Sequence, residues 1–457
     1  MLTSTDDRNK NTCNFRYLYH HIKSITCVLM IVCILTPALA RGQYEYIDID
    51  KPFLRKIPMA IPNFVALTNS SANQGTLKKA TGLLTDALVF TRYFKMLDRG
   101  AYLIDPNRPA IKAGEINFYN WTGIGAELLV TGGLAEKGDL VDLELRLFDT
   151  FSGKRLVGKR YHGKTADLRK IIHRFCGEVI MQMTGKQGIF NSKIAFVSTG
   201  TGTKEIYISD FDGYAPRQFT RHKKLSMFPA WSSDGKWLAY TSYAKGKPDI
   251  YLKKIKGNRQ TVIEKKGLNI TPAWVPGRFE LAATLSFSGN QEIYLLTGAG
   301  KIIKTITRNW ASDLSPTWSP DGKRMAFVSN RAGSPQIYIK DFNSNRVERL
   351  TFEGSYNTQP SWSPAGDRIA YTAMDNGMSN VYVIGLEDGE PVQLTRDAGD
   401  NESPSWSPDG SLIVFSSTRE GTSRLYVMTA FGTDQKRLLT LPGEQSNPRW
   451  SPSMSKN

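Results

Sequence analysis

The fold is decided by the stretch Pro404-Ser405-Trp406-Ser407-Pro408-Asp409-Gly410, which returns at a fixed interval through the C-terminal part of this 457-residue chain. Its tryptophan, each time with a proline two places before it, recurs as Trp231, Trp274, Trp318, Trp362, Trp406 and Trp450. The successive spacings are 43, 44, 44, 44 and 44 residues. A constant interval of this length indicates a repeat architecture in which each copy is one structural unit.

Each period has the same internal order of short β-rich runs and turns. After the phrase quoted above come the apolar run Leu412–Ser416, the loop Thr418–Gly421, a second run Arg424–Met428, a turn at Gly432 and the short run Arg437–Thr440. Together with the phrase itself this makes four short strands per period. Four strands in a period of about 40 to 45 residues are typical of one propeller blade.

The Ser-Pro-Asp-Gly part of the phrase predicts a tight turn. Proline presets φ at about −65°, and glycine adopts a positive φ without a clash at Cβ. We therefore interpret the carboxylates of Asp234, Asp321 and Asp409 as turn formers rather than catalytic groups. The phrase is degenerate after Trp274, Trp362 and Trp450, which turn chemistry tolerates.

Residues 1–40 have the composition of a secretory signal peptide. Four basic residues precede an apolar run from Ile25 to Leu35, and Ala38-Leu39-Ala40 ends the segment with small residues where a signal peptidase requires them. We therefore expect export to the periplasm and cleavage after Ala40. The alternative is a membrane anchor, but an anchor needs about 20 apolar residues and this run is about half as long.

Cleavage would leave Cys176 as the only thiol of the mature chain, since the other three cysteines precede Ala40. One thiol excludes an intrachain disulfide and a Cys-rich zinc site. Cys176 lies in the segment Leu168–Met181, where apolar residues recur at helical spacing. We expect a buried residue on a helix face rather than a nucleophile.

Residues 51–188 are expected to form a compact α/β domain, preceded by a mobile N-terminal arm over residues 41–50. In the run Leu140–Leu147, apolar and polar residues alternate strictly from Val141 onwards, which predicts one polar face and one face that packs on the helices. The predicted strands are Lys56–Ile61, Glu127–Thr131, Val141–Asp149 and Arg155–Tyr161, and the predicted helices are Thr76–Thr91 and Thr165–Met183.

Residues 189–457 are expected to form an all-β six-bladed propeller with a C-terminal closing strand. Lys193–Ser198 matches Lys236–Thr241, the run that follows the first phrase, but no Pro-x-Trp phrase precedes it. Conversely, Asn447–Trp450 is a phrase with no blade after it. The two fragments complete each other, and ring closure would remove the open edges of the sheets.

The basic residues are distributed unevenly along the chain, whose formal net charge is +17. Residues 193–310 contain 19 basic and 8 acidic side chains, whereas residues 311–457 contain 14 and 17. One side of the ring should therefore be basic, through Lys223-Lys224, Lys253-Lys254 and Lys265-Lys266. In an exported protein this favours acidic partners or anionic lipid headgroups over nucleic acid; a solvated lysine-rich surface is the simpler alternative.

The sequence lacks two motifs of common hydrolases. It contains no Gly-x-Ser-x-Gly and no His-Glu-x-x-His. The histidines after Ala40 are His162, His173 and His222, each isolated, and Asp210–Gly213 lacks the further carboxylates of a calcium loop. We therefore expect no catalytic residues, no cofactor and no metal, and a protein whose task is binding.

A signal peptide, an α/β domain and a six-bladed propeller built on Pro-x-Trp-Ser-Pro-Asp-Gly resemble the TolB family of the Tol-Pal system of Gram-negative bacteria. The resemblance covers essentially the whole mature chain, including Trp121–Gly132, which is similar to the family's Trp-containing helix-to-strand segment. It implies a periplasmic scaffold that binds a peptidoglycan-associated outer-membrane lipoprotein (Pal) and inner-membrane Tol proteins such as TolA. It further implies roles in outer-membrane integrity and cell division, a peripheral envelope association without a transmembrane segment, and a monomer.

The expected partner site surrounds one mouth of the propeller channel. In each blade the loop that enters the inner strand and the loop between the second and third strands lie on the same face, and these loops vary more than the turns opposite. The candidate partner-binding residues are Met227, Ile270, Leu314, Asn330, Arg331, Thr358, Asp375, Glu402, Thr418, Arg419 and Ser446. The resemblance assigns a TolA-like partner to the N-terminal arm, with Gly42, Gln43, Tyr44, Glu45 and Tyr46 as candidates.

The alternative function is a propeller-type hydrolase or a carbohydrate-binding protein that uses the central channel. Prolyl oligopeptidase-type peptidases carry similar propellers, but they need a hydrolase domain in addition. A glycosidase would place two convergent carboxylates at the channel mouth, whereas a scaffold would place apolar and amide residues there.

Overall fold

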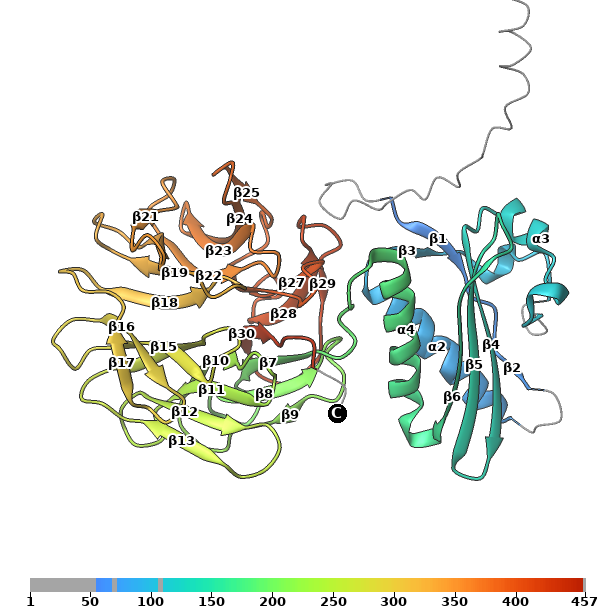
Figure 1. Cartoon of the computed structure of the whole chain (residues 1–457), viewed down its shortest axis with the longest axis horizontal. Coiled ribbons are helices and arrows are strands. Elements are labelled where there is room, and N and C mark those ends of the chain that lie inside the picture. Colours follow the sequence, from blue (N-terminus) through green and yellow to red (C-terminus); the bar gives the residue numbers. More distant parts are fainter. Residues whose placement is uncertain (1–54, 68–71, 106–109, 455–457) are drawn as a thin grey trace, which may run out of the picture. The chain divides into compact units, whose positions relative to one another are not determined.

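The computed structural model describes residues 55–67, 72–105 and 110–454. All of them belong to the second of the two units into which the chain divides, Asp48–Asn457. Within it lie an α/β region and a β-propeller (Figure 1). The predicted signal peptide and N-terminal arm lie outside the described residues.

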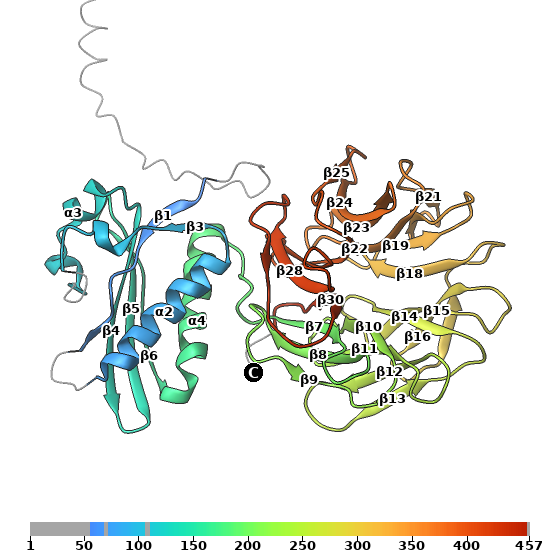
Figure 2. The same ribbon diagram turned by 180° about the vertical axis from the view of Figure 1, so that it is seen from behind.

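The α/β region is a sheet of strand order β3-β1-β4-β5-β6, with β2 paired to β4. Strand β1 is parallel to β3 and β4, whereas β4, β5 and β6 are antiparallel. Helices α2 and α4 pack on one face of the sheet through a shared apolar core (Figure 2). The elements are β1 (Ile57–Ala60), β2 (Val65–Ala66), α2 (Gln74–Phe90), β3 (Phe94–Met96), η1 (Arg99–Ala101), η2 (Ala113–Glu115), α3 (Phe118–Gly123), β4 (Leu128–Lys137), β5 (Leu140–Asp149), β6 (Arg155–Lys164), η3 (Thr165–Asp167) and α4 (Leu168–Thr184).

The predicted strands and both predicted helices are present, because their ends carry local signals. Helix α2 begins after Asn73, whose side-chain oxygen accepts a hydrogen bond from the Gly75 N–H at 2.7 Å. Helix α4 ends at Gly185, which has a φ of 70°. The structure also contains short elements between residues 94 and 123 that the sequence pattern did not predict.

The prediction of one polar sheet face is wrong at the C-terminal end of β5. Arg146 and Phe148, which lie on the supposed polar face, are buried. Phe148 packs with Trp121 of α3 and with Leu129 in a second, smaller apolar cluster. The segment that contains α3 therefore covers part of the face opposite the two long helices.

Six four-stranded antiparallel sheets form the propeller, as predicted (Figure 1). The first complete blade in the chain consists of β10 (Ser226–Trp231), β11 (Trp237–Ser242), β12 (Asp249–Lys254) and β13 (Gln260–Ile263). The second consists of β14 (Asn269–Trp274), β15 (Glu280–Leu285), β16 (Glu292–Thr297) and β17 (Ile302–Thr305). The third consists of β18 (Asp313–Trp318), β19 (Arg324–Ser329), β20 (Gln336–Asp341) and β21 (Val347–Arg349). The next two are β22 (Asn357–Trp362), β23 (Arg368–Asp375), β24 (Met378–Gly385) and β25 (Pro391–Gln393); and β26 (Asn401–Trp406), β27 (Leu412–Ser417), β28 (Arg424–Thr429) and β29 (Lys436–Arg437).

The sixth blade joins the two ends of the propeller sequence. Its order is β30-β7-β8-β9, from β30 (Gln445–Trp450), β7 (Lys193–Ser198), β8 (Glu205–Asp210) and β9 (Arg217–Gln218). Trp450 lies opposite Ile194, and Gln445 lies opposite Ser198. The red β30 and the green β7 lie side by side in Figures 1 and 2. The predicted closure of the ring by the C-terminal strand is confirmed.

Each inner strand carries a β-bulge just before its proline. In β10 the pairing with β11 passes from Met227↔Thr241 to Ala230↔Ala239, so β10 has one extra residue there. Phe228, inside the bulge, has a φ of 53°, and the equivalent residues of the other blades have positive φ as well. Because proline cannot donate a ladder hydrogen bond, a bulge in an edge strand is where a sheet tolerates it.

The tryptophan of the phrase joins neighbouring blades. The indole Nε1 of Trp231 donates to the carbonyl of Arg449 at 3.0 Å, and three other blades make an equivalent bond. Trp450 instead donates to the Ser192 hydroxyl at 2.8 Å. Among the described residues, the Nε1 of Trp362 has no hydrogen-bond partner. These bonds explain why the repeat keeps one tryptophan per blade.

The aspartates of the phrase are turn formers, as predicted. Asp321 Oδ1 accepts hydrogen bonds from the Ser319 hydroxyl at 2.6 Å and from the Lys323 N–H at 3.1 Å. The Ser319 bond is the main reason that the pKa of Asp321 is lowered. Asp234 and Asp409 make the same pair of bonds in their turns.

Candidate partner-binding face and axial channel

The loops of the propeller divide into two sets, one at each end of the channel. Because all neighbouring strands within a blade are antiparallel, the loop into each inner strand and the loop between its second and third strands end at the same face. We name this the mouth face. The Ser-Pro-Asp-Gly turns lie at the opposite end, which we name the turn face.

Six of the predicted partner-binding residues occupy one equivalent position, the second residue of each inner strand. Each is half-buried except for Glu402, which is exposed. They lie beside the loops of the mouth face, so the structure brings them into one ring around the channel. The six residues are Met227, Ile270, Leu314, Thr358, Glu402 and Ser446.

Arg331 and Arg419 are held inside their blades. Both Oδ atoms of the buried Asp313 accept from Arg331 Nη2, at 3.0 and 2.9 Å. Arg419 donates to Asn401 Oδ1 at 3.0 Å and to Gln435 Oε1 at 2.8 Å. Both guanidinium groups also lie over aromatic rings of the same blade. Reversing either charge would therefore disturb the blade itself as well as any bound partner.

The other three predicted residues lie where the second and third strands join, Asn330 and Thr418 in the loop and Asp375 as the last residue of β23. Asn330 and Asp375 are exposed, and Thr418 accepts a hydrogen bond from the Asp400 N–H at 2.8 Å. Asp375 is near the tip of the β23–β24 hairpin, whose pairing continues to Asp375↔Met378. These two strands have 8 residues each, against 6 in the same strands of the other blades, so regular pairing here extends into the segment that is an open loop elsewhere.

The mouth face also presents a set of exposed apolar side chains that the sequence analysis missed. Trp310 is 77% exposed and Phe352 is 72% exposed. The tryptophan period alone gave no signal for Trp310, because Trp237 also stands outside the period and is buried. The set, which we name the apolar mouth residues, comprises Leu225, Phe287, Trp310, Phe352, Tyr356, Met374 and Met378.

The predicted basic side of the ring is divided between the two faces. Lys223-Lys224 and Lys265-Lys266 precede inner strands and therefore lie on the mouth face. Lys253-Lys254 ends β12 and leads to the turn face. Lys245, on the mouth face, pairs with Glu264 at 2.6 Å, so part of the local positive charge is neutralised.

The axial channel contains a cavity of about 50 Å³. Its lining includes the bulge residues of the inner strands and one charged side chain, the guanidinium of Arg449. A second cavity of about 370 Å³ opens towards the turn face, between tryptophans, prolines and serines of three blades. Neither lining contains a carboxylate, so neither has the pair of acids that glycoside hydrolysis requires.

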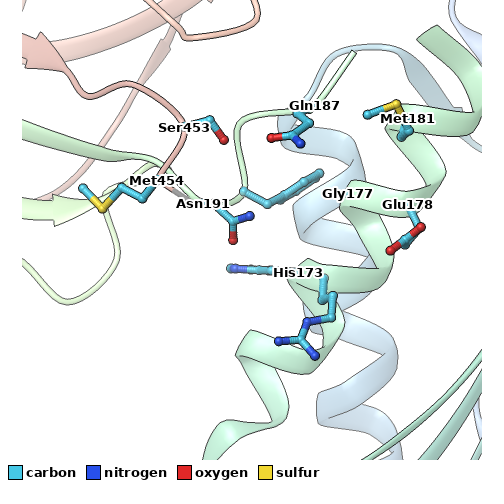
Figure 3. Close-up of a pocket in the computed structure, with 11 residues that line it drawn as sticks. His173, Gly177, Glu178, Met181, Gln187, Asn191, Ser453 and Met454 are labelled. Atoms are coloured by element: carbon cyan, nitrogen blue, oxygen red, sulfur yellow. The ribbon is translucent and has the colours of Figure 1, made fainter. Parts of the chain in front are cut away.

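A cavity of about 400 Å³ lies beside α4 (Figure 3). His173, Gly177, Glu178 and Met181 of α4 line it, as do Ser453 and Met454. Burial, together with the nearby Arg169, lowers the pKa of His173 to about 4. Its edge-on contact with the ring of Phe211 fits this neutral, packed state.

Cys176, the thiol of the α/β region, lies in the core. Cys176 is fully buried on α4, as predicted, and burial raises the pKa of its thiol. Within the ranges that the structure describes, no group of three or more His, Cys, Asp or Glu side chains could hold a metal ion. The helices described there include none that is long and apolar enough to cross a membrane.

Known proteins match both parts of the chain. Residues 180–454 match the family model described as the TolB beta propeller domain, and residues 45–156 match the TolB amino-terminal domain. The "Tol-Pal system protein TolB" of Desulfosudis oleivorans is 56% identical over 288 residues, covering 63% of this chain and 65% of that protein. The "Protein TolB homolog" of Chlorobium chlorochromatii is 42% identical over 298 residues, covering 64% and 66%. The chain thus aligns with slightly less than two thirds of the length of these relatives.

A solved structure extends the match. The crystal structure of TolB from Acinetobacter baumannii aligns with a TM-score of 0.76 at 28% sequence identity. The alignment covers 87% of this chain and 97% of that chain, so it includes both the α/β region and the propeller.

Proposed function

The chain belongs to the TolB family, and from this premise we propose that it is a non-enzymatic scaffold of a Tol-Pal-type complex in the periplasm. Its propeller binds a Pal-like outer-membrane lipoprotein over the mouth face. Its N-terminal arm, residues 41–50, binds a TolA-like inner-membrane protein after cleavage of the signal peptide behind Ala40. Through these two contacts it supports outer-membrane integrity and envelope constriction at cell division.

The observation that carries the proposal is the gathering of exposed apolar side chains on the mouth face. Single exposed apolar residues are normal on a protein surface, but several large ones on one face are typical of a protein interface. Tryptophan, tyrosine, phenylalanine and methionine are the residues enriched in interface cores. All of the apolar mouth residues except Leu225 are of these types, with Trp310 and Phe352 the most exposed.

The surroundings of these residues also suit a protein partner. The ring of second-position residues adds half-buried apolar and polar groups near the channel, and the lysines before β10 and β14 add a charged rim. The β23–β24 hairpin stays paired as far as Asp375↔Met378 and so holds the exposed Met374 and Met378 on a regular ladder. An apolar centre with a polar rim is the usual anatomy of such an interface.

We further propose that the functional units are the signal peptide (1–40), the arm (41–50), the α/β domain (51–188) and the propeller (189–457). The hydrolase and carbohydrate-binding alternatives are less well supported. The polar groups that line the axial cavity are an arginine, hydroxyls and two amides, and these groups can bind but cannot replace a pair of catalytic acids.

The test is the affinity of the mature protein for a soluble form of the lipoprotein encoded by the same genome, measured by isothermal titration calorimetry. We expect the double variant Trp310→Ala, Phe352→Ala to lose about 2 kcal/mol or more of binding free energy, a factor of about 30 in Kd. The matched control is Val392→Ala on the outer strand β25, where the side chain is 58% exposed. Equal affinities for the double variant and the control would reject the mouth face as the docking surface.

A further inference from the structure

One arginine enters the axial channel at a position where the other blades have small residues. Arg449 lines the central cavity of about 50 Å³. Its long side chain therefore fills space that an alanine or a serine would leave open. The residues between the proline and the tryptophan of the six phrases are, in chain order, Ala230, Ala273, Thr317, Ser361, Ser405 and Arg449.

The guanidinium of Arg449 has no anionic partner in the part of the chain that the structure describes. Its side chain makes one hydrogen bond there, from Nη1 to the carbonyl of Pro404 at 3.1 Å. Burial lowers its pKa to about 10, and no neighbouring carboxylate opposes the shift. Arg449 therefore still carries its charge at neutral pH, and a desolvated charge without a counter-ion is unfavourable. The contrast is Arg331, whose charge is paired with Asp313.

A neutral donor lines the same cavity. The amide oxygen of Gln359 accepts from the Thr372 hydroxyl at 2.7 Å and from the Ser403 N–H at 2.8 Å. These two bonds fix the orientation of the amide and leave its NH₂ group without a partner among the described residues. Gln359 and Arg449 both line the cavity, in which no acidic side chain takes part. The cavity is therefore rich in donors and poor in anions.

We infer that the axial channel binds a single carboxylate group, with Arg449 as its charged ligand and Gln359 as a neutral donor. The planar guanidinium fork matches the two oxygens of a carboxylate. A cavity of about 50 Å³ has room for a small group of a few heavy atoms, such as a carboxylate. The group belongs either to a small organic acid or to an acidic side chain of a partner docked on the mouth face; the second source rests on the proposed function.

The first experiment uses acetate as the probe and the mature protein at constant ionic strength. Line broadening of ¹³C-labelled acetate by the protein should saturate, and Arg449→Gln should raise the apparent Kd at least tenfold. Lys266→Gln is the control, because it removes an exposed positive charge of the mouth face and leaves the channel intact. Unsaturable broadening by the parent protein, or equal Kd values for the parent and Arg449→Gln, would overturn the inference.

Two further variants keep the test decisive if Arg449→Gln does not fold. Arg449→Lys retains the charge but loses the two-point fork, so its Kd should lie between those of the parent and of Arg449→Gln. Gln359→Leu removes the neutral donor and should weaken acetate binding severalfold. An unchanged Kd in both variants would contradict a site built from these side chains.

Competition then separates the two sources of the carboxylate. If the soluble lipoprotein displaces acetate, an acidic side chain of the partner occupies the channel in the complex. If acetate stays bound in the complex, the ligand is a small acid. The acetate measurement needs no partner, so it remains valid even if the lipoprotein fails to bind, an outcome that would count against the proposed function alone.

Discussion

Replacing Trp450 by alanine tests the closure of the ring. Trp450 is 6% exposed, and its indole Nε1 donates to the Ser192 hydroxyl at 2.8 Å. Removing a buried tryptophan costs about 3–5 kcal/mol, and the lost hydrogen bond adds about 1 kcal/mol. We therefore expect a loss of about 4–6 kcal/mol in the free energy of unfolding.

The assay is reversible urea unfolding of the mature protein, followed by tryptophan fluorescence and by circular dichroism, together with a thermal scan. In a domain of this size 1 kcal/mol corresponds to about 2–4 °C, so the melting temperature should fall by about 8–24 °C. Trp310→Ala is the matched control, because its side chain is 77% exposed and should change stability by less than about 0.5 kcal/mol.

The result that would refute the reasoning is a Trp450→Ala protein that melts cooperatively within 2 °C of the parent, as about 0.5 kcal/mol of change would allow. Deleting residues 446–457 extends the test, because it removes most of β30 and exposes edges of β7 and of the neighbouring blade. The deletion should unfold more easily than Trp450→Ala. A truncated protein with parental stability would mean that the ring does not depend on its closing strand.

Three further predictions follow from burial and from the leader sequence. The pKa of His173 is about 4 in the native protein and about 6.5 in the unfolded chain, so between these pH values only the unfolded chain binds the proton. The free energy of unfolding should therefore fall by about 3 kcal/mol as the pH drops from 6.5 to 4. Urea titrations of His173→Gln at several pH values should lack that part of the pH dependence. The buried Cys176 thiol should not react with Ellman's reagent in the native protein but should react on unfolding, and rapid native labelling would contradict its burial. N-terminal sequencing of the exported protein should begin at Arg41, and a sequence beginning at Met1 would disprove cleavage.

The architecture of the propeller could be predicted because its repeat constrains local chemistry and long-range pairing together. A tryptophan every 44 residues fixed the number of blades, and the orphan strands at Lys193–Ser198 and Asn447–Trp450 fixed how the ring closes. Both conclusions needed only the count and the spacing of one phrase. The turn role of the aspartates followed from the same phrase.

The candidate site was harder to predict, because equivalent positions in different blades can differ widely in how exposed their side chains are. The prediction took the same position in every blade, and the structure places these six second-position residues on the mouth face as expected. The same approach overlooked Trp310 and Phe352, because these residues have no counterpart in the other blades. It also treated Arg331 and Arg419 as surface charges. Their long side chains turn back to buried groups of their own blades, a contact that depends on three-dimensional packing.

In the α/β region, the short elements before β4 could not be predicted for a similar reason. The helices and long strands have a clear periodicity, but the segment before β4 contains only short elements whose apolar residues follow no period. Trp121 and Phe148 meet there because the chain folds back across the sheet. The alternation of β5 therefore predicted a polar face that is buried at one end.

The proposed docking of the lipoprotein on the mouth face is tested most directly by hydroxyl-radical footprinting. The protein is oxidised alone and in complex with the soluble lipoprotein, and the oxidised side chains are identified by mass spectrometry. Aromatic and methionine side chains are the most readily oxidised, and the mouth face exposes Trp310, Phe352, Met374 and Met378, while Phe279 is exposed at the turn face. We predict that oxidation of the four mouth-face residues falls at least threefold in the complex and that oxidation of Phe279 does not change. Protection of Phe279 with undiminished oxidation of the mouth-face residues would show that the partner docks on the other face.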